Sequence, residues 1–304
     1  MAEPTPGSTG KPLLSSTTFA RLGRSKRMPA FFPRRRFILV ALLLGTGVFP
    51  ALAANNAVPA APLSSAPLQP KHVGWSFEGP FGVYDRASLQ RGFQVYKEVC
   101  STCHTLSSVT FRDLGPGGVG FSPAEVAAIA AEYSIPVGPH QKGMTGDAGG
   151  APLQRAPTPA DHFPHPFANE QAMRAAMNGA VPPDLSMIIN ARAGHSDYVY
   201  SIITGFGQTP PANEKVARGM QYNPYYPGHQ IAMPPPLTDD SVTYTDGTRP
   251  TTDQEARDVV SFLAWAGDPN MEERKSAIFR VILYIFVFIG LLYFSFHHIW
   301  RPWH

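Results

Sequence analysis

Cysteine is scarce in this chain of 304 residues, which contains only two. Two cysteines cannot form the multiple bridges that stabilise small secreted domains. A structural zinc site needs about four Cys or His ligands in paired clusters, and no second cluster accompanies the two cysteines. A thioredoxin-like redox pair expects a surrounding βαβ pattern, which is also absent. The cysteines therefore need a different explanation.

Charge is also low, with Asp, Glu, Lys and Arg making up 15% of the residues. The basic residues form no stripe with interleaved aromatics, so we expect no nucleic-acid partner. Eight of the 25 basic residues but only one of the 22 acidic residues lie in residues 1–53, so without this segment the formal net charge changes from +3 to −4. A mildly acidic chain could attract a basic soluble protein.

Both cysteines lie in the segment Cys100-Ser101-Thr102-Cys103-His104. C-x-x-C-H is the attachment signature of a c-type haem. Two thiols on one helical turn can add to the two haem vinyl groups, and the next side chain then lies beneath the iron. We therefore predict one covalent haem c on Cys100 and Cys103, with His104 as the proximal ligand through a neutral imidazole nitrogen. No structural disulfide is expected.

Residues 1–53 have the composition of a targeting segment. Three arginines at 34–36 precede an apolar run at 37–49, and Ala51-Leu52-Ala53 follows as a small-residue cleavage site. The run is shorter than the roughly 20 residues that cross a bilayer. A bacterial signal peptide and a two-part mitochondrial presequence both fit, and both deliver the chain to the side of the membrane where c-type haem is attached.

The sequence after the leader predicts mainly helices and long loops. Residues 54–71 form an Ala- and Pro-rich extended arm without periodicity. Helix start and stop signals then predict five helices: one capped by Asp85 that reaches Cys100, one from Ser122 to about Tyr133, one from Asn169 to Gly179, one from Asp184 to about Arg192, and one from Asp197 to Thr204. A further helix is expected from Thr252 to Trp265.

The loop from Pro136 to Pro166 is rich in Gly and Pro and is expected to be irregular. Its His162 and His165 lack a second cluster of ligands, so no further metal site is expected there. Residues 277–296 are apolar apart from Arg280, which lies one turn inside the run and can extend its charge to the interface. They predict one transmembrane helix, with the haem domain outside the cytoplasm or matrix and a short tail inside.

Several separate motifs resemble the cytochrome c1 family. They are Trp75-Ser76-Phe77, Phe81-Gly82, Asp85 and residues 89–104, 178–186, 197–206 and 223–234, in this order along the chain. The resemblance covers roughly residues 72–304. It implies an electron-transfer subunit of quinol--cytochrome-c reductase, which takes single electrons from the Rieske iron-sulfur protein and passes them to soluble cytochrome c, with cytochrome b in the same complex.

An electron carrier also needs a sixth iron ligand, and a soft, neutral methionine favours ferrous iron. The candidates are Met144, Met173, Met177, Met187, Met220, Met233 and Met271. Met173, Met177 and Met187 fall in predicted helices as core residues, and Met271 lies at the membrane edge. Met233 precedes three prolines that can hold an irregular strand over a haem face, and it occupies the family's ligand position. His195 is the rival ligand, although its position resembles a helix start.

The resemblance also implies that Arg192 and Tyr198 contact the haem propionates and that Pro182 packs beside the ring, whereas a plain surface role for Arg192 stays open.

The predicted fold class is all-α, a c-type cytochrome domain with long irregular loops plus one C-terminal transmembrane helix. The predicted divisions are the targeting segment 1–53, the arm 54–71, the haem domain 72–274, the anchor 275–298 and the tail 299–304. The location is the bacterial inner membrane with a periplasmic haem domain or, alternatively, the mitochondrial inner membrane. Two other function classes stay open: a membrane-anchored haem subunit of a dehydrogenase or terminal oxidase, and a haem-based gas sensor.

Overall fold

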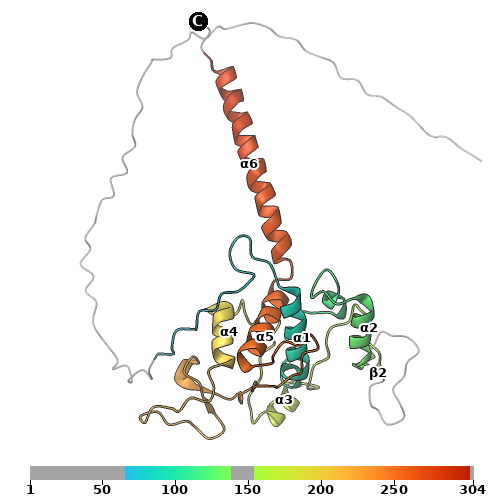
Figure 1. Cartoon of the computed structure of the whole chain (residues 1–304), viewed down its shortest axis with the longest axis vertical. Coiled ribbons are helices and arrows are strands. Elements are labelled where there is room, and N and C mark those ends of the chain that lie inside the picture. Colours follow the sequence, from blue (N-terminus) through green and yellow to red (C-terminus); the bar gives the residue numbers. More distant parts are fainter. Residues whose placement is uncertain (1–65, 138–153, 302–304) are drawn as a thin grey trace, which may run out of the picture. The chain divides into compact units, whose positions relative to one another are not determined.

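A computed structural model describes residues 66–137 and 154–301. The predicted targeting segment, Met144, most of the extended arm and the last three residues of the tail lie outside this part of the chain. The described helices are α1 (Arg86–Glu98), α2 (Pro123–Ala131), α3 (Glu170–Ala176), α4 (His195–Ile203), α5 (Thr252–Gly267) and α6 (Met271–Ile299), shown in Figure 1. This confirms the predicted all-α class.

Short 3₁₀ turns and two small antiparallel strand pairs complete the described part. The turns are Cys100–Thr102, Phe111–Leu114 and Pro227–His229. Strand β1 (Ile135–Pro136) pairs with β2 (Gln154–Arg155), and β3 (Gln221–Tyr222) pairs with β4 (Gln230–Ile231). No strand was predicted, because two-residue ladders leave no alternating pattern in the sequence.

Three predicted helix starts are confirmed. The Asp85 carboxylate accepts a hydrogen bond from the amide of Ala87 at the start of α1. Ser122 forms a reciprocal capping box with Glu125 at the start of α2, where Pro123 is the first helical residue. Asn169 caps α3 by accepting from the amide of Ala172. Each cap satisfies amide groups that the first helical turn leaves without partners.

Two local predictions were wrong. Residues 184–192 form a series of turns instead of a helix, because the Asp184 side chain bonds a distant segment and the amide of Ser186. The N-cap of α5 is Thr251, whose hydroxyl accepts from the amide of Gln254, and not Thr252. The Thr252 amide and hydroxyl both donate to Asp239 instead.

The predicted core methionines are also not core residues. Met187 is 50% exposed, and Met173 and Met177 are partly exposed. The helix expected to bury Met187 does not form, and α3 has no buried residue.

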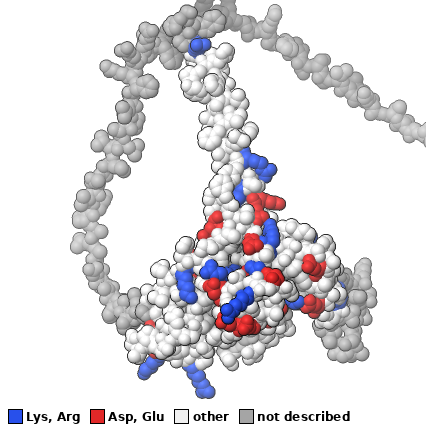
Figure 2. Space-filling view, viewed as in Figure 1, with Lys and Arg blue, Asp and Glu red and all other residues white. Residues whose placement is uncertain are grey.

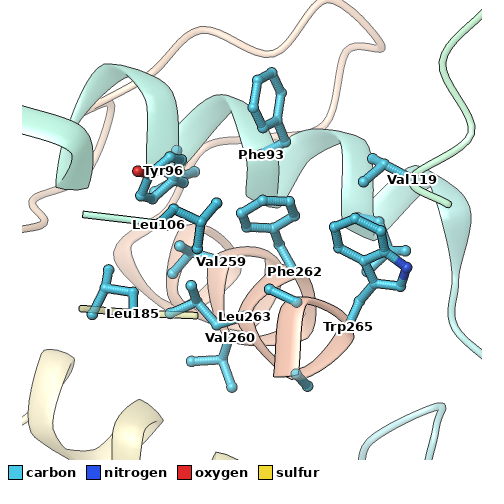
Figure 3. Close-up of a cluster of buried hydrophobic side chains, with 14 of the residues drawn as sticks. Phe93, Tyr96, Leu106, Val119, Leu185, Val259, Val260, Phe262, Leu263 and Trp265 are labelled. Atoms are coloured by element: carbon cyan, nitrogen blue, oxygen red, sulfur yellow. The ribbon is translucent and has the colours of Figure 1, made fainter. Parts of the chain in front are cut away.

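The core is built on the packing of α1 against α5. Phe93 and Tyr96 of α1 face Phe262 of α5, with ring centroids 5.7 and 5.8 Å apart (Figure 3). Trp265 stacks on Phe262 from the same helix. These aromatic rings are fully or almost fully buried. Helix α5 is therefore buried nearly all round, beyond the single apolar face that its sequence pattern suggests.

Gly92 allows the two helices to approach closely. A Cβ atom at this position would lie 2.0 Å from the backbone oxygen of Asp258 and 2.8 Å from the Cβ of Phe262. Such distances are far below van der Waals contact. Only glycine therefore fits where α1 crosses α5.

Two buried carboxylates on α5 bond two different neighbours, α1 and the segment that follows Met233. Asp258 is fully buried and accepts hydrogen bonds from Arg91 Nε at 2.8 Å and from Ser88 Oγ at 2.7 Å. Glu255 is also fully buried, and its Oε1 accepts from the amide of Val242 at 3.1 Å. Burial raises the pKa of Glu255 above its ordinary value. Asp258 therefore links α5 to α1, and Glu255 links α5 to Val242 in the segment that follows Met233.

Helix α6 has the length and composition of a membrane span. Its 29 residues extend about 44 Å, which exceeds the roughly 30 Å of a bilayer core. Its mean hydropathy reaches 2.4, and the apolar stretch is not buried against the protein. Figure 2 shows charged side chains at its first turns and uncharged surface along its middle. The helix begins at Met271, four residues before the predicted start of the anchor.

We predict that Gly92→Ala destabilises the protein by about 2 kcal/mol or more, because the added methyl group overpacks the crossing of α1 and α5. In an unconstrained helix the same change stabilises by roughly 0.5–1 kcal/mol, so the sign itself is diagnostic. The measurement is guanidinium unfolding of the haem-loaded protein followed by helical circular dichroism.

Gly117→Ala is the matched control, since a Cβ there would meet nothing within 4 Å. An unfolding midpoint for Gly92→Ala equal to that of this control would contradict the close crossing.

Candidate functional site

The C-x-x-C-H segment forms a tight turn directly after α1. The helix ends at Glu98, and residues 100–102 continue as a single 3₁₀ turn. The amides of Cys103 and His104 both donate to the carbonyl of Cys100, at 3.2 and 2.9 Å. Both cysteines are partly buried free thiols, so no disulfide joins them. Burial raises the pKa of the Cys100 thiol to about 12.

His104 is oriented by a carbonyl group from a distant part of the chain. Its Nδ1 lies 2.8 Å from the backbone oxygen of Pro183. A hydrogen bond at Nδ1 fixes the ring and leaves Nε2 as the nitrogen that can bind a metal, as is common for metal-ligating histidines. Burial lowers the pKa of His104, which favours the neutral imidazole that a ligand requires.

The Pro183 carbonyl is held in place by its neighbour Asp184. One oxygen of this carboxylate accepts from the Thr105 hydroxyl at 2.6 Å and from the Ser107 amide and hydroxyl at 2.9 and 2.7 Å. The other oxygen accepts from the amide of Ser186 at 2.8 Å. Two backbone contacts nearby reinforce the link, from Leu185 N to Thr105 O and from Ser108 N to Ser186 Oγ.

These donors also set the charge state of Asp184. Burial alone would raise its pKa, but the hydrogen bonds from Ser186, Thr105 and Ser107 outweigh burial and hold the pKa well below its ordinary range. The carboxylate is thus ionised at neutral pH. We name residues 182–186 together with residues 104–108 the His104 clamp.

Apolar side chains next to the clamp are exposed. Val181 and Met187, which flank the clamp segment 182–186, are 41% and 50% exposed. Two exposed aliphatic side chains beside two free thiols and an oriented imidazole suit a flat apolar group. The residues present therefore fit a haem attached at this turn.

The predicted sixth ligand, Met233, lies two residues after β4 and is partly buried. In the described part of the chain, no hydrogen bond or ring contact joins it to the His104 clamp. Its segment is fixed from both sides: β4 pairs with β3 before it, and the buried Leu237 follows it. Met233 as ligand stays a prediction.

Three further residues were predicted to contact the haem, and two of them, Arg192 and Tyr198, lie near the start of α4. Pro182 is partly buried and belongs to the clamp. Arg192 is exposed and forms no ion pair within residues 66–137 and 154–301; its Nη1 lies 3.2 Å from the Ala191 carbonyl. Burial raises the pKa of Tyr198, and the charge of Arg192 acts against this shift. The structure thus places Arg192 near Tyr198.

The rival ligand His195 is a helix start, as its sequence position indicated. It is the first residue of α4, and its Nδ1 lies 3.2 Å from the carbonyl of Ile189. No group of three or more His, Cys, Asp or Glu suited to a metal occurs among the described residues, which include His162 and His165.

Sequence reasoning missed the clamp. Pro183 acts through its backbone oxygen, which no side-chain pattern reveals. Asp184 was interpreted as the start of a helix, although an acidic residue after two prolines can equally bond to another segment. The buried pair of Arg91 and Asp258 was also missed, because both residues occupy polar positions of amphipathic helices.

A thiol-bearing turn, an oriented imidazole and an apolar helix of membrane-spanning length define a membrane-anchored haem protein. Comparison with known proteins gives the same class. The model of the "Cytochrome C1 family" matches residues 75–303. The chain therefore belongs to the cytochrome c1 family.

Individual relatives come from bacteria and from mitochondria. The chain is 45% identical to "Cytochrome b/c1" of Bradyrhizobium diazoefficiens over 249 residues, which is 76% of this chain but only 35% of that protein. It is 43% identical to "Cytochrome c1" of Rhodospirillum rubrum over 75% of this chain and 86% of the relative. It is 46% identical to "Cytochrome b-c1 complex catalytic subunit, mitochondrial" of Candida albicans over 68% of this chain and 69% of the relative.

Membership of this family gives the general function. The chain is a haem protein with a role in electron transfer, and the Candida albicans relative is named as a subunit of a cytochrome b-c1 complex. This agrees with the function predicted from the motifs and distinguishes it from the dehydrogenase, oxidase and gas-sensor alternatives.

We predict that Asp184→Asn destabilises the protein by about 1–3 kcal/mol at neutral pH, because hydrogen bonds to a charged acceptor are weakened. A carboxyl group with a depressed folded pKa contributes its stability above its unfolded pKa of about 4 and loses it as the pH falls. The difference between wild type and variant should therefore be constant from pH 7 down to about pH 5 and shrink as the pH falls below about 4. Unfolding free energies across this range provide the measurement.

The control is Asp240→Asn. Asp240 is exposed and has a left-handed backbone conformation, which asparagine also tolerates. Equal stability of Asp184→Asn and wild type at neutral pH would show that the carboxylate does not hold the clamp.

Proposed function

We propose that the chain carries one haem c, bound through thioethers to Cys100 and Cys103, with His104 and Met233 as axial ligands. In this role it receives single electrons from the Rieske iron-sulfur protein and passes them to soluble cytochrome c. It would do so as the electron-transfer subunit of quinol--cytochrome-c reductase. The observation that carries the proposal is the hydrogen-bonding distance between His104 Nδ1 and the Pro183 carbonyl, next to two free thiols.

When bound, the haem supplies a one-electron centre, and the residues of this chain set its properties. The Pro183 carbonyl accepts a hydrogen bond from Nδ1–H, which fixes the ring plane of His104 and increases the basicity of Nε2. The thioether of Met233 is soft and uncharged, so it favours the ferrous state and raises the potential. With His104 and Met233 both bound to the iron, oxygen would have no open site.

Three further residues have proposed roles around the ring. Arg192 has an exposed guanidinium without an acidic partner in the described part of the chain, which suits a haem propionate. Tyr198 lies near that charge and can add a hydrogen bond. Pro182 precedes the residue whose carbonyl oxygen accepts the hydrogen bond from His104, so it can pack against the ring face.

The proposed location places the haem domain in the periplasm, with α6 in the bacterial inner membrane. The alternative is the mitochondrial inner membrane with the domain in the intermembrane space, since relatives of both kinds match. Covalent attachment of haem outside the cytoplasm or matrix supports this orientation. Cytochrome b and the Rieske protein would be the neighbours within the complex, and holding the domain beside its donor raises their effective concentration.

We predict that Met233→Leu keeps the covalent haem but lowers its reduction potential. The iron should become partly high-spin and bind carbon monoxide, because leucine cannot fill the axial position. A fall on the order of 100 mV corresponds to about 2.3 kcal/mol, or roughly a fiftyfold shift in the transfer equilibrium. Potentiometric titration and quinol to cytochrome c activity are the measurements.

The matched control is Met187→Leu, at an exposed methionine beside the site. It should keep the potential and the low-spin spectrum. If Met233→Leu also keeps both, with normal turnover, another residue is the sixth ligand.

The proposed partners are tested separately by capture of the tagged full-length chain from membranes in mild detergent. We expect cytochrome b and the Rieske protein in the eluate, identified by mass spectrometry and by their haem b and iron-sulfur spectra. The control is a chain truncated before Lys275, which lacks most of α6 and shows whether capture of these partners depends on this helix. Recovery of oxidase or dehydrogenase subunits without cytochrome b would contradict the proposal.

A further inference from the structure

An exposed aromatic residue outside α6 lies beside the membrane-spanning helix. Phe81 is 79% exposed, and Val83 nearby is 57% exposed. Both belong to the turn formed by residues 76–83, which precedes α1 and which we name the Phe81 loop. Neighbouring large apolar side chains exposed this strongly on a loop indicate a contact with another protein or with a membrane.

The position of Phe81 along α6 is fixed by a ring contact. Its ring stacks on that of Phe279, with centroids 5.1 Å apart and an interplanar angle of 11°. Phe279 is the third residue of the apolar run 277–296, so it lies within one turn of the start of the predicted span. A membrane that contains this run therefore places Phe81 at the depth of the interface, where aromatic side chains are enriched.

Several backbone groups of the Phe81 loop are hydrogen-bonded within the protein. Lys275 Nζ donates to the carbonyls of Phe77 at 2.7 Å and Gly82 at 3.0 Å, which joins the loop to the first turns of α6. The amide of Val83 donates to the Ser76 carbonyl at 3.0 Å. Satisfied backbone groups are what allow a non-helical segment to enter a poorly hydrated region.

The junction is held further by Glu272 at the start of α6. Its two carboxylate oxygens accept from the amide of Tyr84 and from the Arg86 guanidinium, each at 2.7 Å. Tyr84, which directly follows the Phe81 loop, and Arg86, the first residue of α1, are therefore both tied to α6. The loop cannot turn away from the helix without breaking these contacts.

We propose that the Phe81 loop is a second membrane contact, with Phe81 and Val83 inserted among the lipids beside α6. The chemistry of the partner is a lipid surface at the level of the glycerol backbone and upper acyl chains. A protein neighbour is the competing occupant. Continuity of Phe81 with the lipid-exposed surface of α6 favours lipid, because Phe279 and Ile278 beside it are themselves 43% and 48% exposed.

Photocrosslinking in native membranes tests this proposal. Phe81 is replaced by p-benzoylphenylalanine in the full-length chain, and the haem spectrum and resistance to an alkaline wash first verify a folded, anchored protein. Irradiation should give an adduct between the chain and phospholipid, detected by mass spectrometry. The same probe at Leu68, which is 54% exposed on the coil that contacts Pro224, is the matched control and should give no lipid adduct.

Several results would overturn the proposal. An adduct to another protein subunit would identify a protein contact, and the absence of any adduct would identify a water-exposed loop. Equal lipid adducts at positions 68 and 81 would show that the reaction is not specific to the loop. If the probe at Phe81 prevents haem attachment, the probe at Val83 is used with the same criteria. The alkaline wash tests only whether α6 anchors the chain in the membrane. An error in the proposed membrane position of α6 can therefore be distinguished from an error in the proposal for the Phe81 loop.

Discussion

The close crossing of α1 and α5 at Gly92 is the constraint on which the rest of the structure depends. Helix α1 ends directly in the turn that carries Cys100 and His104, and α5 is followed within a few residues by α6. A side chain at residue 92 would enter the backbone of Asp258. The same contact therefore fixes the C-x-x-C-H turn relative to the helix that leads to α6.

Electrostatics of buried groups strengthen this arrangement at several points. Arg91 and Asp258 pair inside the crossing, where removal of one partner would leave a buried charge. Glu255 and Asp258 belong to the same helix, yet Glu255 bonds a backbone amide of the segment that follows Met233. One helix pair thus touches the segment of each proposed axial ligand. The buried acids of α5 therefore have a physical role, because Asp258 bonds α1 and Glu255 bonds the segment that follows Met233.

The sequence predicted those features that depend on neighbours along the chain. Asp85, Ser122 and Asn169 cap helices because their side chains bond amides two or three residues away. The C-x-x-C-H turn and the long apolar helix were predictable for the same reason. The family motifs then added the function, which local physics alone does not give.

The features that were mispredicted depend on contacts between distant segments. Asp184 has the appearance of a helix cap, but its carboxylate bonds Thr105 and Ser107, almost eighty residues earlier. Thr252 loses its capping role because Asp239 binds its hydroxyl. Phe81 gives no local sign of its stacking on Phe279, and Pro183 contributes only a backbone oxygen. Each of these interactions requires the folded arrangement to be known.

The central claim is that one iron is held between His104, oriented by the clamp, and Met233 from a segment more than a hundred residues later. The most direct measurement is NMR of the reduced protein with ¹³C-labelled methionine methyl groups, because the ring current of the haem shifts an axial methionine strongly upfield. We expect one such methyl signal, assigned to Met233 by its absence in a Met233 variant. A shifted signal from another methionine, or no shifted signal, would contradict it.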